Sequence, residues 1–332
     1  ELSKLVAIQT NGQENGAINV SIGKGQRLVI GNSAEQLRMV LPAAQDGPVE
    51  LYLSVPSGSE SEVTSKLTGG ELGGALDAGA RLINNTRRDV GLLAAGIVGT
   101  FNAQHASGDD LSGQPGEAFF EPLDVAVTGT RTNSGQSTIT ATILDVGELT
   151  GDGFSVAYEE AGIRLTNLRT GTSELVADGV LDFDGLRLDI QAATPAMTGD
   201  VFFIEPSLGA AARMEVAITD GASIAAANRD GAVGDNRNML SLIALRDSSS
   251  LNSGTQSYTS FYGATLSGMA VETRSAISNA ETEQSLLRSA EDRLEGLIGV
   301  NLDEEATNLI RYQQAYQAAA QVITVANEMF DT

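Results

Sequence analysis

A seven-residue repeat over residues 302–330 constrains the fold of this chain more than any other feature. Its positions are spaced four and three residues apart without a slip: Leu302, Ala306, Leu309, Gln313, Tyr316, Ala320, Ile323, Asn327 and Phe330. This period is typical of the seam of a coiled coil. Polar Gln313 and Asn327 lower the stability of such a seam, and an isolated helix is marginal in water. The sequence therefore predicts a helix over 302–330 that depends on a partner.

Two more helices are predicted upstream of this repeat. Residues 258–298 carry a heptad line whose middle positions are small and polar. A helix over residues 72–97 carries another stripe with the same spacing: Leu72, Leu76, Gly79, Ile83, Thr86, Val90, Leu93 and Ile97. Because a helical stripe usually faces a core, we interpret this second stripe as buried.

The first β-type pattern lies between residues 16 and 55. Ile18, Val20 and Ile22 alternate with polar neighbours, and the segment "GKGQ" that follows provides a turn. A similar alternation returns near residues 49–55. Alternation with a period of two indicates strands that bury one face, so we predict a small antiparallel hairpin unit.

The second β-type pattern is a block rich in Thr, Gly and Asp at residues 119–206. Leu186, Leu188 and Ile190 alternate there with polar residues, as other short runs in the block do. Asp184-Gly185 separates two such runs and is a strong hairpin signal. We predict an all-β domain.

Together these elements predict an α+β multidomain fold, with a long-helix bundle domain that carries the small β-hairpin unit and an inserted all-β domain. The first part of the helical domain is expected at residues 1–118 and includes the hairpin unit. The all-β domain at 119–206 interrupts it. The second part, residues 207–332, ends in the coiled-coil-like C-terminal helix.

Composition excludes several kinds of site and partner. Asp and Glu number 43 against 20 Lys and Arg, and the resulting net charge of −23 repels nucleic acid and anionic lipid surfaces. No apolar run reaches the roughly 20 residues that span a bilayer, so no membrane insertion is expected. The chain has no cysteine, and its one histidine, His105, ends a helical stretch where it can satisfy free carbonyls. We expect no catalytic residue, metal site or cofactor.

Three groups of acidic residues are weighed as cation sites. Asp182, Asp184 and Asp189 lack the spacing and the closing Glu of a calcium loop. The acids of "GDD" at 108–110 and of "GDN" at 234–236 lie beside glycine. We interpret all three groups as turn and hairpin residues.

Several segments, in this order along the chain, resemble one family. They are "GGELGGALDAG", "FNAQHASGDDLSGQPGEAFF", "VAITDGASIAAA", "GDNRN" and "NLDEEATNLIRYQQAYQAAAQVI". They look like the successive motifs of the FlgK family of flagellar hook-associated proteins, the first hook-filament junction proteins. The last segment is shared more loosely among axial proteins of the flagellum, whereas the middle ones are specific to this family. The resemblance also implies that this chain lacks the family's N-terminal helical region.

The resemblance implies a structural protein of the bacterial flagellum and no enzyme. Copies would self-assemble in the flagellar axis as the junction between hook and filament. The partners implied are other copies, the hook protein, the adjacent junction protein and a cytoplasmic export chaperone on the C-terminal helix. The implied location is extracellular, in the flagellum, after type III export without a cleaved signal peptide.

The predicted interface for assembly and for the chaperone lies on the C-terminal helix. It consists of Leu309, Ile310, Tyr312, Tyr316, Ile323 and Phe330. Two other classes of function stay open on the residues alone. One is a surface adhesin or glycan-binding module that acts through the β domain, and the other is a carboxylate-based hydrolase.

Overall fold

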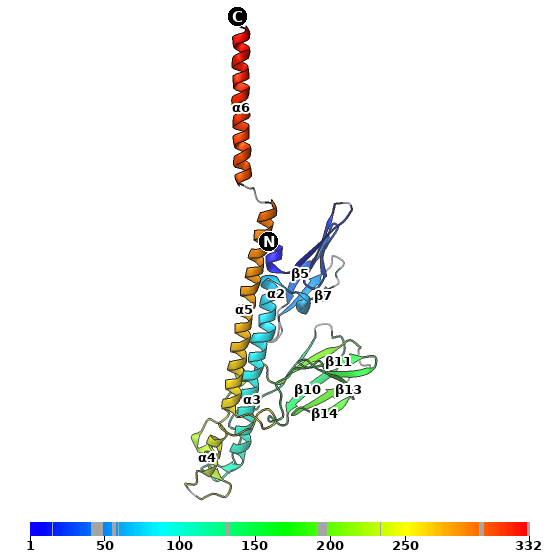
Figure 1. Cartoon of the computed structure of the whole chain (residues 1–332). Helices are drawn as coiled ribbons and strands as arrows, with labels where there is room; N and C mark the ends of the chain where they lie inside the picture. Colours follow the sequence, from blue (N-terminus) through cyan, green and yellow to red (C-terminus); the bar gives the residue numbers. More distant parts are fainter. Residues whose placement is uncertain are drawn as a thin grey trace. The chain divides into compact units, whose positions relative to one another are not determined.

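A computed structural model describes residues 1–14, 16–40, 49–54, 58, 60–130, 133–191, 198–232, 234–298 and 302–330. The chain forms two units, Glu1–Val271 and Glu272–Thr332, and each is described by itself. Helices and antiparallel sheets occur together, which confirms the predicted α+β class (Figure 1).

The N-terminal part of the first unit is a small β unit. Its elements are α1 (Leu2–Leu5), β1 (Ile8–Gly12), β2 (Ile18–Ile22), β3 (Gln26–Ile30), β4 (Ser33–Ala34), β5 (Gln36–Val40), β6 (Glu50–Ser54), β7 (Glu60–Glu62) and the 3-10 turn η1 (Thr64–Lys66). Two antiparallel sheets form, in the orders β1-β2-β3-β4 and β5-β6-β7. The β2–β3 hairpin confirms the predicted turn, and buried Ile22, Leu51 and Leu53 belong to the core of the unit. Val55, also predicted in a strand, lies outside the described residues.

A helical rod follows the β unit without a break in the backbone winding. It consists of α2 (Gly70–Asp77), a π-helical segment η2 (Ala78–Ile83) and α3 (Asn84–Ala106), as Figure 1 shows in cyan. The N–H of Asn84 donates to the carbonyl of Gly79, five residues back, as π winding requires. The rod therefore contains one wider turn between two α-helical parts.

The predicted core stripe of this helix is wrong for its middle part. Ile83 is 54% exposed and Val90 is 38% exposed. The helix instead buries a neighbouring face made of small residues and a few larger ones: Gly91, Leu92, Ala94, Ala95, Gly96, Val98 and His105. Small residues allow close approach: an added Cβ at Gly91 would lie 1.7 Å from the carbonyl oxygen of Ser207. Close contact with the backbone of Ser207 and the apolar packing of Leu92 and Ala95 together decide which face is buried.

The described residues of the β domain form eight strands. They are β9 (Ala126–Gly129), β10 (Thr138–Ile143), β11 (Phe154–Glu159), β12 (Gly162–Asn167), β13 (Ser173–Val176), β14 (Gly179–Phe183), β15 (Leu186–Gln191) and β16 (Val201–Glu205). The sheets run β13-β12-β11-β16-β9 and β10-β15-β14. Leu186, Leu188 and Ile190 are fully buried, as their alternation predicts. Asp184 and Gly185 both have positive φ and form the predicted β14–β15 turn.

The apolar core of the β domain continues into α3. Leu92 and Ala95 belong to the same buried cluster as the strand residues of both sheets. Beside this contact, Arg88 donates two hydrogen bonds to Glu205, of 3.1 and 2.7 Å. This hydrogen bonding raises the pKa of Arg88, although burial opposes the increase. The β domain is thus fixed to the helix by apolar packing and by a partly buried ion pair.

A second ion pair stabilises the loop before β11. Asp152 is 5% exposed and accepts hydrogen bonds from Arg169 and, at 2.8 Å, from Asn167. Burial by itself raises the pKa of Asp152, but the hydrogen bonds from Arg169 and Asn167 outweigh it and hold the pKa below its ordinary value. The ionised carboxylate is therefore the form that stabilises the fold.

We expect the change Asp152→Asn to weaken the dependence of the free energy of unfolding on pH in the acid range. The lowered folded-state pKa means that the carboxylate contributes stability above about pH 4, the unfolded-state value, and that this contribution is lost as the pH falls through the folded-state pKa. Urea titrations at successive pH values should show the gap between the chain and its variant shrinking below that pH. A gap that stayed constant down to about pH 2 would contradict this account.

The remaining elements close the first unit and form the second. They are β8 (Gly108–Asp109), the 3-10 turns η3 (Ala210–Arg213) and η4 (Gly221–Ser223), β17 (Ala227–Asn228), α4 (Arg237–Ala244), α5 (Tyr258–Ile298) and α6 (Leu302–Phe330). The first turns of α5 belong to the first unit, where Phe261 packs against the β-domain cluster. The helices predicted over 258–298 and 302–330 are confirmed. In the part of the chain that the structure describes, no helix combines the length and the apolar character needed to cross a membrane.

Candidate assembly surface

Helix α6 carries the predicted seam on an open surface. Leu309, Tyr316 and Ile323 lie seven residues apart along the helix and are 61%, 79% and 61% exposed. Ile310 and Tyr312, also predicted, are exposed as well. The side chain of Phe330 lies outside the described residues. Large apolar side chains in water at this density are typical of an interaction surface.

Two apolar residues of α6 were missed by the heptad argument. Val322 and Val325 are 68% and 55% exposed. At about 100° per residue, Val325 lies roughly opposite Leu309 on the helix, so the apolar surface is wider than one seam. A helix that is apolar on several faces is suited to burial among more than one neighbour. Val322 and Val325 lie off the heptad line, as Ile310 and Tyr312 do, so the heptad spacing alone does not indicate them.

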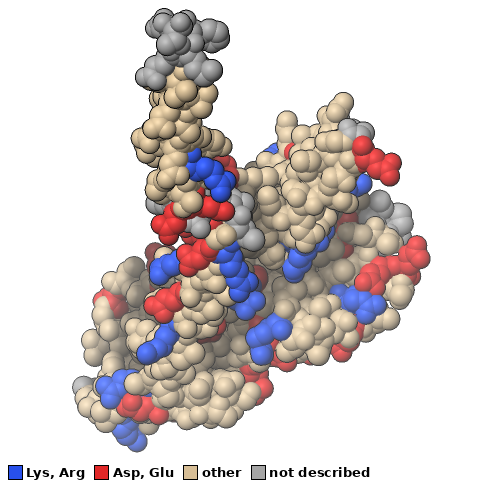
Figure 2. All heavy atoms as spheres, turned by 45° about the horizontal axis from the view of Figure 1, so that its top comes forward, with Lys and Arg blue, Asp and Glu red and all other residues tan. Residues whose placement is uncertain are grey.

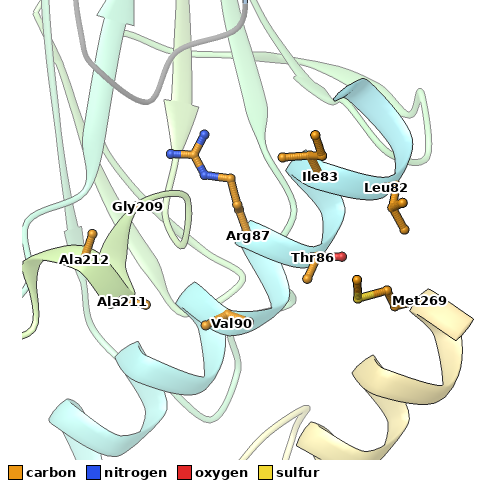
Figure 3. Close-up of a pocket in the computed structure, with 9 residues that line it drawn as sticks. All are labelled: Leu82, Ile83, Thr86, Arg87, Val90, Gly209, Ala211, Ala212 and Met269. Atoms are coloured by element: carbon orange, nitrogen blue, oxygen red, sulfur yellow. The ribbon is translucent and has the colours of Figure 1, made fainter. Parts of the chain in front are cut away.

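A second open apolar surface lies on the first unit, in a groove of about 400 Å³. We call it the Val90 groove. Figure 3 shows its lining, which comes from the rod, η3 and α5: Leu82, Ile83, Thr86, Arg87, Val90, Gly209, Ala211, Ala212 and Met269. Ile83, Thr86 and Val90 follow one side of the rod, and Met269 faces them from α5 (Figure 3). Among the residues that the structure describes, no Asp or Glu lines this groove.

The groove exists because the rod buries its small-residue face elsewhere. With Gly91 and Ala95 packed inward, the stripe through Ile83, Thr86 and Val90 is left open. Met269, on the heptad line of α5, is 43% exposed at the groove. Two stripes with the spacing of coiled-coil seams thus border one apolar groove, which has the chemistry of a seat for another helix.

His105 is a structural residue in a buried polar cluster at the end of α3. Its Nδ1 lies 2.7 Å from the carbonyl oxygen of Glu117, and its Nε2 accepts from the N–H of Ala225 at 2.9 Å. Asn238 is also buried there, and its side-chain amide donates to the carbonyl of Ala225 at 2.6 Å. The predicted bonding of His105 to the carbonyls of its own helix end is therefore wrong. Because both ring nitrogens are engaged and the ring is fully buried, His105 is not available as a catalytic base.

Most of the acidic residues form local turn and hairpin contacts, whereas Asp109 is buried and binds Arg229 and the N–H of Asp230, far away in the sequence. Arg187 donates to Asp182 at 2.8 and 2.7 Å across the β14–β15 hairpin, which lowers the pKa of Asp182. Asp110 accepts from two backbone N–H groups of the following turn. Asp235 binds Arg237. Among the described residues, no three acidic or histidine side chains are grouped as metal ligands would be.

The surface charge is mixed on the side that Figure 2 shows. Lys and Arg side chains lie interspersed with Asp and Glu rather than gathered in one broad basic area. Long-range attraction of a polyanion requires such a basic area, and the net charge of −23 opposes it. The surfaces considered for assembly are therefore the apolar faces of α6 and the Val90 groove.

Family models match three segments of the chain. Residues 1–120 match the flagellar hook-associated protein FlgK helical domain, and residues 127–206 match the D2-like domain of flagellar hook-associated protein 1. Residues 298–332 match the C-terminal model of the flagellar basal body rod FlgEFG proteins.

Curated relatives match along the whole chain. Flagellar hook-associated protein 1 of Escherichia coli (strain K12) is 32% identical over 336 residues, and that of Salmonella typhimurium is 30% identical over 344 residues. Each alignment covers 100% of this chain but only 61% and 62% of the relative. The chain thus spans about three fifths of the length of these proteins.

A solved structure has the same fold. The flagellar hook junction protein FlgK from Burkholderia pseudomallei superimposes with a TM-score of 0.77 at 20% identity, over 90% of this chain and 76% of that one. The family models and the curated relatives that match this chain are all named as flagellar proteins, so the class of protein is a component of the bacterial flagellum. The chain belongs to the FlgK family of flagellar hook-associated proteins. The family is one of structural components and not of enzymes.

Proposed function

We propose that this chain forms part of the junction between hook and filament and assembles there through its exposed helices. The observation that carries the proposal is the apolar surface of α6, where Leu309, Tyr316 and Ile323 are more than half exposed. A helix with that surface gains stability only when a partner covers it. Membership of the FlgK family supplies the setting in which copies of the chain meet.

The proposed partners follow from the same surfaces. Other copies of the chain, the hook protein and the adjacent junction protein would cover α6 and the helical body in the assembled axis. Before assembly, an export chaperone would cover the apolar positions of α6, because an exposed apolar helix is prone to aggregation. We further propose type III export without a cleaved signal peptide, which brings the protein to the flagellum outside the cell.

The domain organisation is part of this proposal. Residues 1–118 and 207–332 would form the helical domain that lines the axis, and residues 119–206 would form the β domain that faces outward. The two sheets formed by β9 to β16 lie within residues 119–206. Their attachment through Arg88 and Glu205 would carry the β domain along with the helical domain during assembly.

The test is the pair of changes Leu309→Asp and Tyr316→Asp in the full-length protein, expressed in cells that lack the native copy. Two carboxylates in the seam would have to be buried without partners, so we expect filament attachment and swimming to be lost. Circular dichroism of the purified variant should still show a folded β domain. Electron microscopy would count cells with filaments.

A control variant separates the seam from added charge. Gln314→Asp with Gln321→Asp adds two carboxylates to the same helix, away from the seam, without removing any apolar side chain, and it should reduce filament number less than the seam variant does. A third variant, Ile83→Asp with Val90→Asp, tests the Val90 groove independently and should also reduce filament number. Full-length filaments on cells that carry the seam variant would overturn the proposal.

The hydrolase alternative has no support in the described residues. Hydrolysis by carboxylates needs two acids facing one cleft, whereas the Val90 groove is apolar and no acid lines it. The acids considered from the sequence are engaged in local turns and ion pairs, and His105 is buried with both ring nitrogens bonded.

A further inference from the structure

We propose that the π-helical segment Ala78–Ile83 is a torsional hinge between the small β unit and the β domain. The inference goes beyond assembly and does not depend on it. The helical rod joins two separate apolar clusters. Leu72 and Leu76 pack against the core of the small β unit, whereas Leu92 and Ala95 belong to the core of the β domain. The structure describes every residue from 77 to 91, and none of them belongs to either cluster.

The winding of this bridge gives it two possible states. A π turn contains one more residue than an α turn, as the bond from the N–H of Asn84 to the carbonyl of Gly79 shows. Rewinding the segment as α-helix would rotate the small β unit about the rod by about 100°, the angular step of one α-helical residue. The ion pair between Asp77 and Arg81 is exposed at both ends and holds the winding only weakly.

Gly79 in the π segment and Gly74, one turn before it in α2, lower helical stability without a packing reason. An added Cβ at Gly74 or Gly79 would meet no atom within 4 Å, and neither residue has positive φ. Gly73 is different, because its Cβ would lie 2.6 Å from the backbone of Thr68. Glycine in an exposed helix lowers helical stability relative to alanine. The structure therefore requires Gly73 for contact, whereas Gly74 and Gly79 contribute flexibility to the segment around the π turn.

The hinge would also change the Val90 groove. Leu82 and Ile83 belong to the π segment and line the groove at the same time. A change in winding would move these two side chains relative to Val90, which lies on the α-helical part. Occupation of the groove and the orientation of the small β unit would then be coupled, because a ligand that favours one winding shifts the population.

Distance measurements between spin labels test the hinge. The chain has no cysteine, so pairs of introduced cysteines carry the labels cleanly. Ser65→Cys with Thr140→Cys spans the π segment, and Ala103→Cys with Thr140→Cys is the matched pair on one side of it. All three positions are exposed. Pulsed electron paramagnetic resonance should give a broad or two-peaked distribution for the spanning pair and a narrow one for the control pair.

Two further variants test whether the π turn causes the broad distance distribution of the spanning pair. Gly74→Ala with Gly79→Ala should narrow the spanning distribution, and deletion of Ala78 should give one shifted peak because it removes the extra residue of the π turn. If the deletion variant does not fold, the alanine pair and hydrogen exchange still test whether the π segment is a hinge. Backbone amides at 79–84 should exchange at least about tenfold faster than those at 92–98, and the alanine pair should slow them. A spanning distribution as narrow as the control in the unmodified chain would overturn the proposal, as would one that neither variant changed.

Discussion

The change Gly91→Ala is expected to destabilise the first unit by about 3 kcal/mol or more. The added methyl group would lie 1.7 Å from the carbonyl oxygen of Ser207 and 2.7 Å from its carbonyl carbon, and both atoms are backbone. Ser207 is fully buried, so the segment has no free space into which it can shift. It also lies two residues after Glu205, the last residue of β16, so a displacement would disturb the bonds between Glu205 and Arg88.

The matched control is Gly74→Ala on the same rod. No atom lies within 4 Å of that added methyl group, so we expect no loss and a gain of about 0.5–1 kcal/mol from helix propensity. Urea denaturation followed by far-ultraviolet circular dichroism would measure both variants under the same conditions. Equal stability of the two would show that close approach at Gly91 does not hold the β domain on the helix.

The change His105→Phe is expected to cost about 2–5 kcal/mol, because two buried backbone groups would each lose a partner. The imidazole engages the carbonyl of Glu117 and accepts from the N–H of Ala225, and no water can replace it where the ring is fully buried. Phenylalanine fills a similar volume beside Phe119, so most of the loss would come from hydrogen bonding and not from a cavity.

A second variant at the same position checks this assignment. His105→Gln can restore one of the two hydrogen bonds and should recover part of the loss. Stability would be compared by urea denaturation at neutral pH. If the Phe variant proved as stable as the unmodified chain, the polar cluster at the end of α3 would not be what joins residue 117 to residue 225.

Much of the fold could be predicted from local patterns. The alternation of Leu186, Leu188 and Ile190 predicted which side of β15 is buried, because side chains on a strand alternate between two faces. Asp184-Gly185 predicted the turn, because both residues tolerate positive φ. The seam of α6 was predicted in the same way, because residues spaced four and three apart lie on one side of an α-helix.

The two wrong predictions, for the buried face of the helical rod and for the partners of His105, share a physical cause. Period shows which residues share a side of a helix, but it does not show which side meets the rest of the chain. On the helical rod, a face of Gly and Ala is buried and the apolar stripe through Ile83 and Val90 stays exposed. The reason is that only small residues allow the backbone at Ser207 to approach. For His105 the partners are residues 117 and 225, which no local pattern connects to it.

The sequence by itself determined the three long helices, the turn at Asp184-Gly185, the family and the apolar seam of α6, because these depend on residues that are neighbours along the chain. Only the tertiary structure decided which face of α3 is buried, where the Val90 groove opens and what His105 binds. These features arise where segments far apart in the sequence come into contact, and close packing there overrides local period.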